Sequence, residues 1–194
     1  MRLAINLILI ALTIFLVWVL YSSIKEPIAF KNEKDRRERV VINKLQDIRT
    51  AQEAYRGITD QFAPNFDTLT EVLTNGKFQI IQVFGDPDDP TNTEAITYDT
   101  FFMPAIDSIR TLGINLDSLR YVPFTNGEVF EIAADTLTYQ KTLVTVCQVG
   151  TKRSNFMGPY ADIKYAKYDN SYDPNSYIKF GDMNKPNLAG NWER

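Results

Sequence analysis

The stretch Leu3-Ala-Ile-Asn-Leu-Ile-Leu-Ile-Ala-Leu-Thr-Ile-Phe-Leu-Val-Trp-Val-Leu-Tyr21 decides the class of this chain. Its 19 residues carry no charge and are mostly aliphatic, interrupted only by Asn6 and Thr13. An α-helix rises about 1.5 Å per residue, so the stretch spans roughly 28 Å, which is close to the hydrocarbon thickness of a bilayer. We therefore predict a transmembrane anchor over residues 1–24 that carries one water-soluble head.

A cleaved secretory signal is the alternative reading of this stretch. Arg2 provides a minimal positive start, but signal peptidase requires small residues at two positions just before the cut. Bulky Leu20 and Tyr21 stand there instead, and no cysteine follows for lipoprotein processing. We expect the segment to remain uncleaved, with Trp18 and Tyr21 in the headgroup layer that such rings prefer.

The charges that flank the span conflict with the orientation we favour. Only Arg2 precedes the span, whereas six basic residues follow it closely: Lys25, Lys31, Lys34, Arg36, Arg37 and Arg39. Taken alone, the positive-inside rule keeps the head in the cytoplasm. Acidic residues are interleaved with these bases, although they count for little in the rule: Glu26, Glu33, Asp35 and Glu38.

The overall composition excludes several function classes. Residues 1–56 carry ten bases and six acids, net +4, whereas residues 57–194 carry eleven bases and eighteen acids, net −7. An acidic head repels phosphates, so we expect no nucleic-acid partner. The chain contains no histidine, which removes Ser-His-Asp and Cys-His nucleophiles and most zinc sites. We predict no cofactor and no catalytic residue. The single cysteine, Cys147, lies in a run of β-branched residues, and we interpret it as a buried structural thiol.

The segment after the anchor predicts an amphipathic stem within residues 25–57. Pro27 is expected to interrupt the helix, with Glu26–Phe30 as a short extended link and a second helix from Asn32 to Arg56. Five apolar residues recur at helical spacing on one stripe of that helix: Val41, Leu45, Ile48, Ala51 and Tyr55. This stripe either closes the core of the head or forms a helix–helix interface with another protein.

The remaining residues, 58–194, predict an α+β head with a small antiparallel sheet. A short helix is expected over Phe66–Asn75, strands over 78–84, 98–102 and 143–149, and a helix over 106–112. The strongest hairpin signal is Asn126-Gly127 between two apolar runs, 119–124 and 129–133. The tail is rich in Tyr, Asn, Asp, Gly and Pro, which predicts an irregular wrap with one strand near 177–180. We expect its tyrosines to pin it against a sheet.

Two sequence motifs carry a resemblance to known proteins. The neck, Ile48-Arg-Thr-Ala-Gln-Glu-Ala-Tyr-Arg-Gly57, followed by Phe62-Ala-Pro64, resembles that of type IV pilins and pseudopilins. Their apolar N-terminal helix continues into an amphipathic one and ends at a small β-sheet head outside the cytoplasm. The Arg-x-Ala-Gln-x-Ala-Tyr stem and the ending Gly190-Asn-Trp-Glu193 are also similar to a group of small single-pass Bacteroidetes membrane proteins. The chain departs from prepilins because residues 1–10 lack their cleavage-site glycine and their glutamate.

One loop has a weak calcium pattern. Asp86, Asp88 and Asn92 stand at alternate positions, as ligands of a calcium loop do, but the central Gly and the distal Glu of an EF-hand are missing. A solvated Asx-Pro turn is the favoured interpretation. We predict no metal site.

These patterns lead to one functional prediction and two alternatives. We predict a non-enzymatic, single-pass structural or interaction protein of the bacterial inner membrane, with its head in the periplasm. Its expected partners are the lipid bilayer and other envelope proteins or further copies of itself. The alternatives are a membrane-tethered enzyme that uses carboxylates such as Glu128, Glu131 or Asp135, and a ligand-binding sensor head.

Overall fold

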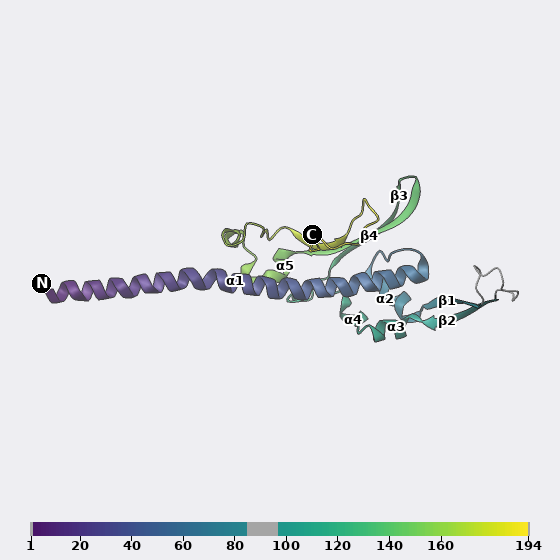
Figure 1. The fold of residues 1–194 in the computed structure, drawn as a ribbon, viewed down its shortest axis with the longest axis horizontal. Coiled ribbons are helices and arrows are strands. Elements are labelled where there is room, and N and C mark those ends of the chain that lie inside the picture. The colour runs from purple at the N-terminus through teal and green to yellow at the C-terminus, as the bar shows by residue number, and fades with distance from the viewer. Residues whose placement is uncertain (1, 85–96, 194) are drawn as a thin grey trace, which may run out of the picture.

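The structure is a computed structural model that describes residues 2–84 and 97–193 (Figure 1). It is an α+β protein in which one long N-terminal helix carries small antiparallel sheets. The elements in chain order are α1 (Arg2–Thr59), α2 (Phe66–Asn75), β1 (Lys77–Phe84), β2 (Thr97–Pro104), α3 (Ala105–Thr111), α4 (Leu116–Leu119), β3 (Glu131–Tyr139), β4 (Thr142–Lys152), α5 (Arg153–Met157), the 3-10 turns η1 (Gly158–Tyr160) and η2 (Ile163–Lys167), and β5 (Tyr177–Gly181).

Helix α1 is continuous, so the predicted break at Pro27 and the extended link over Glu26–Phe30 are wrong. Pro27 lies inside the helix, and Figure 1 shows a nearly straight rod on both sides of it. A proline costs one backbone hydrogen bond and crowds the preceding turn, but its fixed φ suits a helix. The apolar run before it and the amphipathic run after it both favour helix, and together they outweigh the local cost. Anchor and stem therefore form one element.

The head is built around the C-terminal half of α1. The sheet formed by β3, β4 and β5 lies on one side of the helix, and α2, α3 and α4 lie on the other (Figure 1). The five residues of the predicted stripe, Val41, Leu45, Ile48, Ala51 and Tyr55, are all buried between these layers. The helix that leaves the anchor is thus also the central element of the core.

The three-stranded sheet has the order β3-β4-β5 and is antiparallel throughout. Its hairpin turns at Gln140 and Lys141, both at positive φ (48° and 70°), and the sequence did not predict this turn. The hairpin predicted at Asn126-Gly127 forms only in a short version, with an antiparallel bridge between Tyr121 and Val129 and two backbone hydrogen bonds beside it. The Asn-Gly signal marks a loop whose glycine is also left-handed (φ 93°), but the long pairing forms elsewhere.

Most other predicted elements are confirmed. Helix α2 has the predicted bounds, the strands expected over 78–84, 98–102 and 143–149 are β1, β2 and β4, and the helix expected over 106–112 is α3. The single strand expected in the tail is β5. Asn65 caps α2 by accepting a hydrogen bond from the Thr68 amide at 2.8 Å.

Candidate functional site

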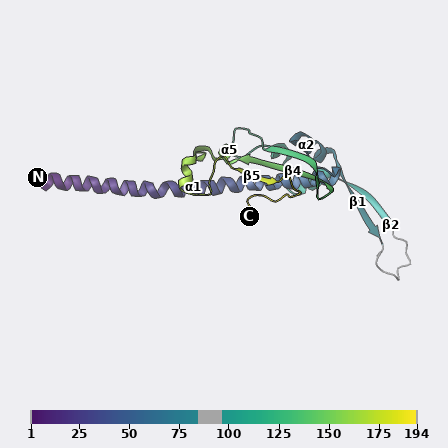
Figure 2. The same ribbon diagram turned by 90° about the horizontal axis from the view of Figure 1, so that it is seen from above.

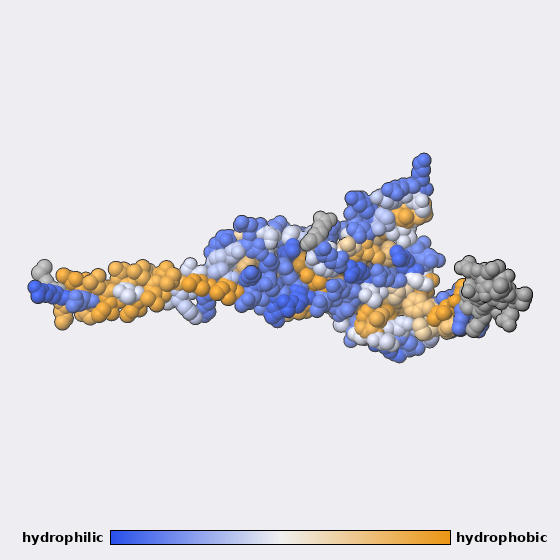
Figure 3. All heavy atoms as spheres, in the orientation of Figure 1, coloured by the Kyte–Doolittle hydropathy of each residue, from blue (hydrophilic) through white to orange (hydrophobic). Residues whose placement is uncertain are grey.

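The N-terminal part of α1 is the only helix of the described residues that is long and apolar enough to cross a membrane. None of its apolar segment is buried by the rest of the chain, and Figure 3 shows it as a bare hydrophobic rod beside a largely hydrophilic head. A core helix of a soluble protein would be covered. The exposure of this segment is compatible with a transmembrane anchor.

The tail grips α1 just beyond the apolar segment, in a region we call the tail clasp (residues 158–176). Phe30 is fully buried there beneath four tyrosines. Its ring stacks on Tyr165 at a centroid distance of 5.2 Å and meets Tyr172 edge-on at 5.0 Å, while Tyr160 and Tyr168 lie within 6.2 Å. The tyrosines therefore pin the tail against a helix rather than against the sheet that the sequence led us to expect.

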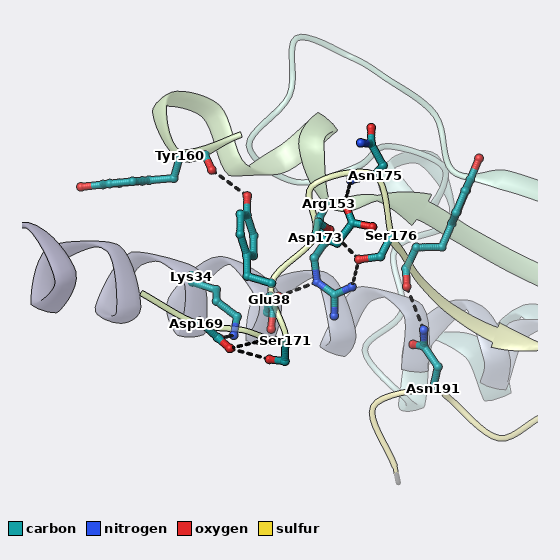
Figure 4. Close-up of polar contacts among 12 residues, drawn as sticks. Lys34, Glu38, Arg153, Tyr160, Asp169, Ser171, Asp173, Asn175, Ser176 and Asn191 are labelled. Carbon is teal, nitrogen blue, oxygen red and sulfur yellow. Dashed lines mark hydrogen bonds and ion pairs between the residues drawn. The ribbon is translucent and has the colours of Figure 1, made fainter. Parts of the chain in front are cut away.

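Two ion pairs hold α1 next to this aromatic cluster (Figure 4). Lys34 of α1 pairs with Asp169, which also accepts a hydrogen bond from the Ser171 hydroxyl at 2.6 Å. The Lys34 ammonium, and secondarily Ser171, hold the pKa of the Asp169 carboxyl at about 2. Farther along the helix, Arg153 donates to Glu38 at 2.8 Å. These contacts join α1 to the tail and to α5 on the side of Phe30 that is farther from the apolar segment.

Arg37 connects α1 to the end of α5. Its guanidinium donates to Glu33 at 2.6 Å and to the Phe156 carbonyl oxygen at 2.6 Å. Arg36 and then Arg37 lower the pKa of Glu33 to about 2. Gly158 ends α5 at φ 56°, and a side chain there would meet the Arg37 guanidinium. The positive φ therefore favours glycine at this position, and a side chain there would also displace the Arg37 guanidinium.

The two motifs of the Bacteroidetes resemblance meet in space. Arg49 of the stem donates to Glu193 of the C-terminal ending at 2.7 Å, and the second Glu193 oxygen accepts from the Gly190 amide at 3.2 Å. Asn191 exchanges backbone and side-chain hydrogen bonds with β5 at Lys179. The ring of Trp192 packs over Gly190, where any Cβ would collide with it. The ending is a structural strap that joins β5 to α1.

Gln52 of the same stem motif is a buried polar residue. Its side-chain amide donates to the Ala63 carbonyl at 3.0 Å and accepts from the Ala63 amide at 2.9 Å. These two bonds satisfy the backbone amide and carbonyl of Ala63 in the loop that follows α1, and they fix where the chain reverses. The stripe residues on either side of Gln52 are buried in the core of the head, which is the first of the two roles predicted for them.

The opposite end of the head carries an exposed apolar element, the distal hairpin formed by β1 and β2. It projects past the end of α1, on the far side of the head from the anchor (Figures 1 and 2). Among the described residues, neither strand pairs with any strand but the other. Its exposed large apolar side chains are Ile81, Tyr98, Phe101, Phe102 and Met103.

The register of the hairpin explains why these side chains are bare. Residues directly opposite each other share a face, so Phe78 opposite Met103 and Ile80 opposite Phe101 form one face. Phe78 packs partly against the core. Ile81 and its diagonal neighbour Phe102, which stands opposite Gln79, project from the other face, with 56 % and 62 % of their surfaces exposed. The sequence already indicates apolar groups on both faces, because adjacent apolar residues in a strand point to opposite faces.

The other predicted residues do not converge on one site. Asp86, Asp88 and Asn92 lie outside the described residues. Glu131 and Asp135 are exposed on the same side of β3 but four residues apart, about 13 Å, which exceeds the roughly 5–9.5 Å of paired catalytic carboxylates. Glu128 lies in the exposed loop before β3. Cys147 is buried as predicted, and burial raises the pKa of its thiol to about 12.

The described residues hold no group of three His, Cys, Asp or Glu side chains that could bind a metal ion. No protein-family model, curated protein or solved structure matches the chain.

Proposed function

We propose that this chain is a single-pass membrane protein of the bacterial cell envelope whose head docks with other envelope proteins, or with further copies of itself, through the distal hairpin. The observation that carries this proposal is the exposed apolar face of β1 and β2, held at the end of a rod that begins with a bare apolar segment. Exposed apolar clusters of this kind mark interaction sites.

The geometry of α1 supports a display function. From Tyr21 to Thr59 the helix rises about 57 Å, and the eight residues of β1 can extend up to about 26 Å farther. Because anchor and stem are one helix, no hinge separates the membrane from the core of the head. The hairpin is presented at a set distance from the bilayer, as a docking element requires.

The experiment that tests docking compares two exposed elements of the same head. Ile81→Ser and Phe102→Ser remove apolar groups from the distal hairpin, while Leu143→Ser removes an even more exposed one (73 %) from the β3–β4 hairpin. Complexes isolated from native membranes through a terminal tag are then sized. We expect both distal variants to lose the associated proteins and Leu143→Ser to retain them. Identical complexes in all three variants contradict the proposal.

We further propose that the head faces the periplasm and the anchor lies in the inner membrane. This part rests on the neck resemblance to pilins and opposes the charge rule. A reporter that is active only in the periplasm, fused after Arg194, tests it. Activity of that reporter is expected, whereas activity of a cytoplasmic reporter alone contradicts it.

A further inference from the structure

The 3-10 turn η2 is the part of the tail clasp that lies closest to the apolar segment. The Tyr168 hydroxyl, directly after this turn, donates to the Glu26 carboxylate of α1 at 2.5 Å. Glu26 follows Tyr21 by five residues, so it lies about 8 Å farther along the helix. If the hydrocarbon ends near Tyr21, η2 lies at the outer edge of the headgroup layer.

Three side chains of η2 are exposed at this level, and we call them the foot: Ile163, Lys164 and Lys167. Ile163 exposes 61 % of its surface although it belongs to a well-packed turn. The two lysines follow Ile163 in the chain, and each ammonium lies over a tyrosine ring, Lys164 at 5.0 Å from Tyr165 and Lys167 at 4.5 Å from Tyr168. Since those rings pack on Phe30, the bases of the foot are fixed relative to α1.

The charge around the foot is positive. Lys25 and Lys31 of α1 are exposed at the same level and add to the two lysines of η2. Two acids oppose them: Glu26, which accepts the Tyr168 hydrogen bond, and Asp162, which accepts from the Lys164 amide at 2.9 Å. The next acids along the helix and tail, Glu33 and Asp169, are each paired with a base from α1. Two positive charges therefore remain in excess.

We propose that the foot rests on the anionic phospholipid headgroups of the bilayer that holds α1, with Ile163 among the headgroups and Lys164 and Lys167 at their phosphates. Charge complementarity and continuity with the membrane segment select this occupant. The inference rests on the proposed function only in requiring α1 to span the membrane. Because α1 is one rod, contact on the side of η2 sets the direction in which the whole head leans.

The test places a fluorophore at the foot of the full-length chain in lipid vesicles. Ile163→Cys is labelled and compared with a label at Leu143→Cys, on the β3–β4 hairpin. The native Cys147 is buried and does not need to be replaced. The quencher is a nitroxide carried on lipid headgroups. Vesicles of phosphatidylcholine alone are compared with vesicles that also contain phosphatidylglycerol.

We expect quenching at position 163 to exceed that at position 143, and to increase with phosphatidylglycerol. Charge reversal by Lys164→Glu and Lys167→Glu is expected to abolish that increase, since each lysine at an anionic surface shifts the equilibrium about fivefold. The matched control, Lys141→Glu with Lys185→Glu, reverses two exposed lysines outside η2 and should leave it unchanged.

Two results overturn the proposal: equal quenching at positions 163 and 143, or quenching at 163 that does not respond to anionic lipid. Flotation of the same samples separates this inference from the proposed function. A chain that fails to float with vesicles contradicts the anchor itself, whereas a chain that floats without quenching at 163 contradicts only the foot.

Discussion

The two ends of the head use their aromatic residues in opposite ways. Near the anchor, the ring of Phe30 is covered by four tyrosines of the tail clasp, and ion pairs flank the cluster. At the distal hairpin, Phe102 and its neighbours project from two strands that pair only with each other within the described chain. The same kind of side chain thus stabilises the head at one end and is left bare at the other.

This difference indicates that the two ends of the head have different roles. A two-stranded hairpin is marginally stable by itself, and burying its apolar face would stabilise it further. Residues 158–176 of the tail cover α1 at Phe30, and the rest of the tail adds β5 and reaches α1 at Arg49. The tail therefore secures the rod, while the apolar face of the distal hairpin stays exposed, which fits the docking role proposed for it.

The largest expected effect comes from breaking the tail clasp. Phe30→Ala leaves a cavity beneath four tyrosines and should lower the free energy of unfolding by about 3–5 kcal/mol. Hydrogen exchange of the full chain in detergent should accelerate across residues 158–176. Ile28→Ala, at a position 55 % exposed on the same helix, is the control and should change little. Unchanged exchange in Phe30→Ala would contradict the anchoring role of the clasp.

The next largest effect is expected from the buried hydrogen bonds between Gln52 and Ala63. Gln52→Leu removes both bonds to Ala63 and leaves a buried amide and carbonyl unpaired, which should cost about 2–4 kcal/mol. Denaturant titration measures this cost. Glu53→Leu, on the exposed side of α1, is the matched control. Equal midpoints for the two variants would show that Gln52 does not hold the loop.

Lowering the pH should destabilise the tail clasp and leave the distal hairpin unaffected. The carboxyl groups of Glu33 and Asp169 have pKa values of about 2 in the folded state, below those of the unfolded chain. The unfolded state therefore binds more protons in acid, and the stability these groups contribute above about pH 4 is lost as the pH falls toward 2. Exchange of residues 158–176 should rise over that window. Asp169→Asn should flatten part of this response, and an unaltered profile in that variant would rule out its pairing as the cause.

The smallest effect on stability is expected at the distal hairpin. Phe102→Ser and Ile81→Ser alter exposed groups and should change the free energy of unfolding by at most about 0.5 kcal/mol. Thermal unfolding of each variant measures this. A large loss would show that the hairpin face supports the head itself, which would remove the contrast between the two ends.

Sequence reasoning predicted local elements better than their assembly. The period of Val41, Leu45 and Ile48 identified the buried stripe, because a helix face needs only local spacing. The helix break predicted at Pro27 was wrong because the lost backbone hydrogen bond at proline is outweighed by the helix-forming residues on both sides. The β3–β4 hairpin was missed because Gln140 and Lys141 form its turn at positive φ, and neither residue type is typical of that conformation.

The candidate sites depend on contacts that are distant along the chain. Phe30 meets tyrosines more than 120 residues later, and Arg49 meets Glu193 at the other end of the chain. No single sequence reveals such pairings, since nothing local specifies them. The sequence shows that the distal hairpin is apolar on both faces but not that these faces are exposed, because a strand of that kind is usually buried on both.

The most direct test of the central claim is photocrosslinking from the distal hairpin in native membranes. A photoreactive phenylalanine analogue is placed at Phe102, and the same analogue at Leu143 is the control. The account predicts a discrete higher-mass adduct from position 102, whose mass separates a second copy of the chain from another protein, and no such adduct from position 143. Absence of an adduct at position 102, or equal adducts from both positions, would contradict it.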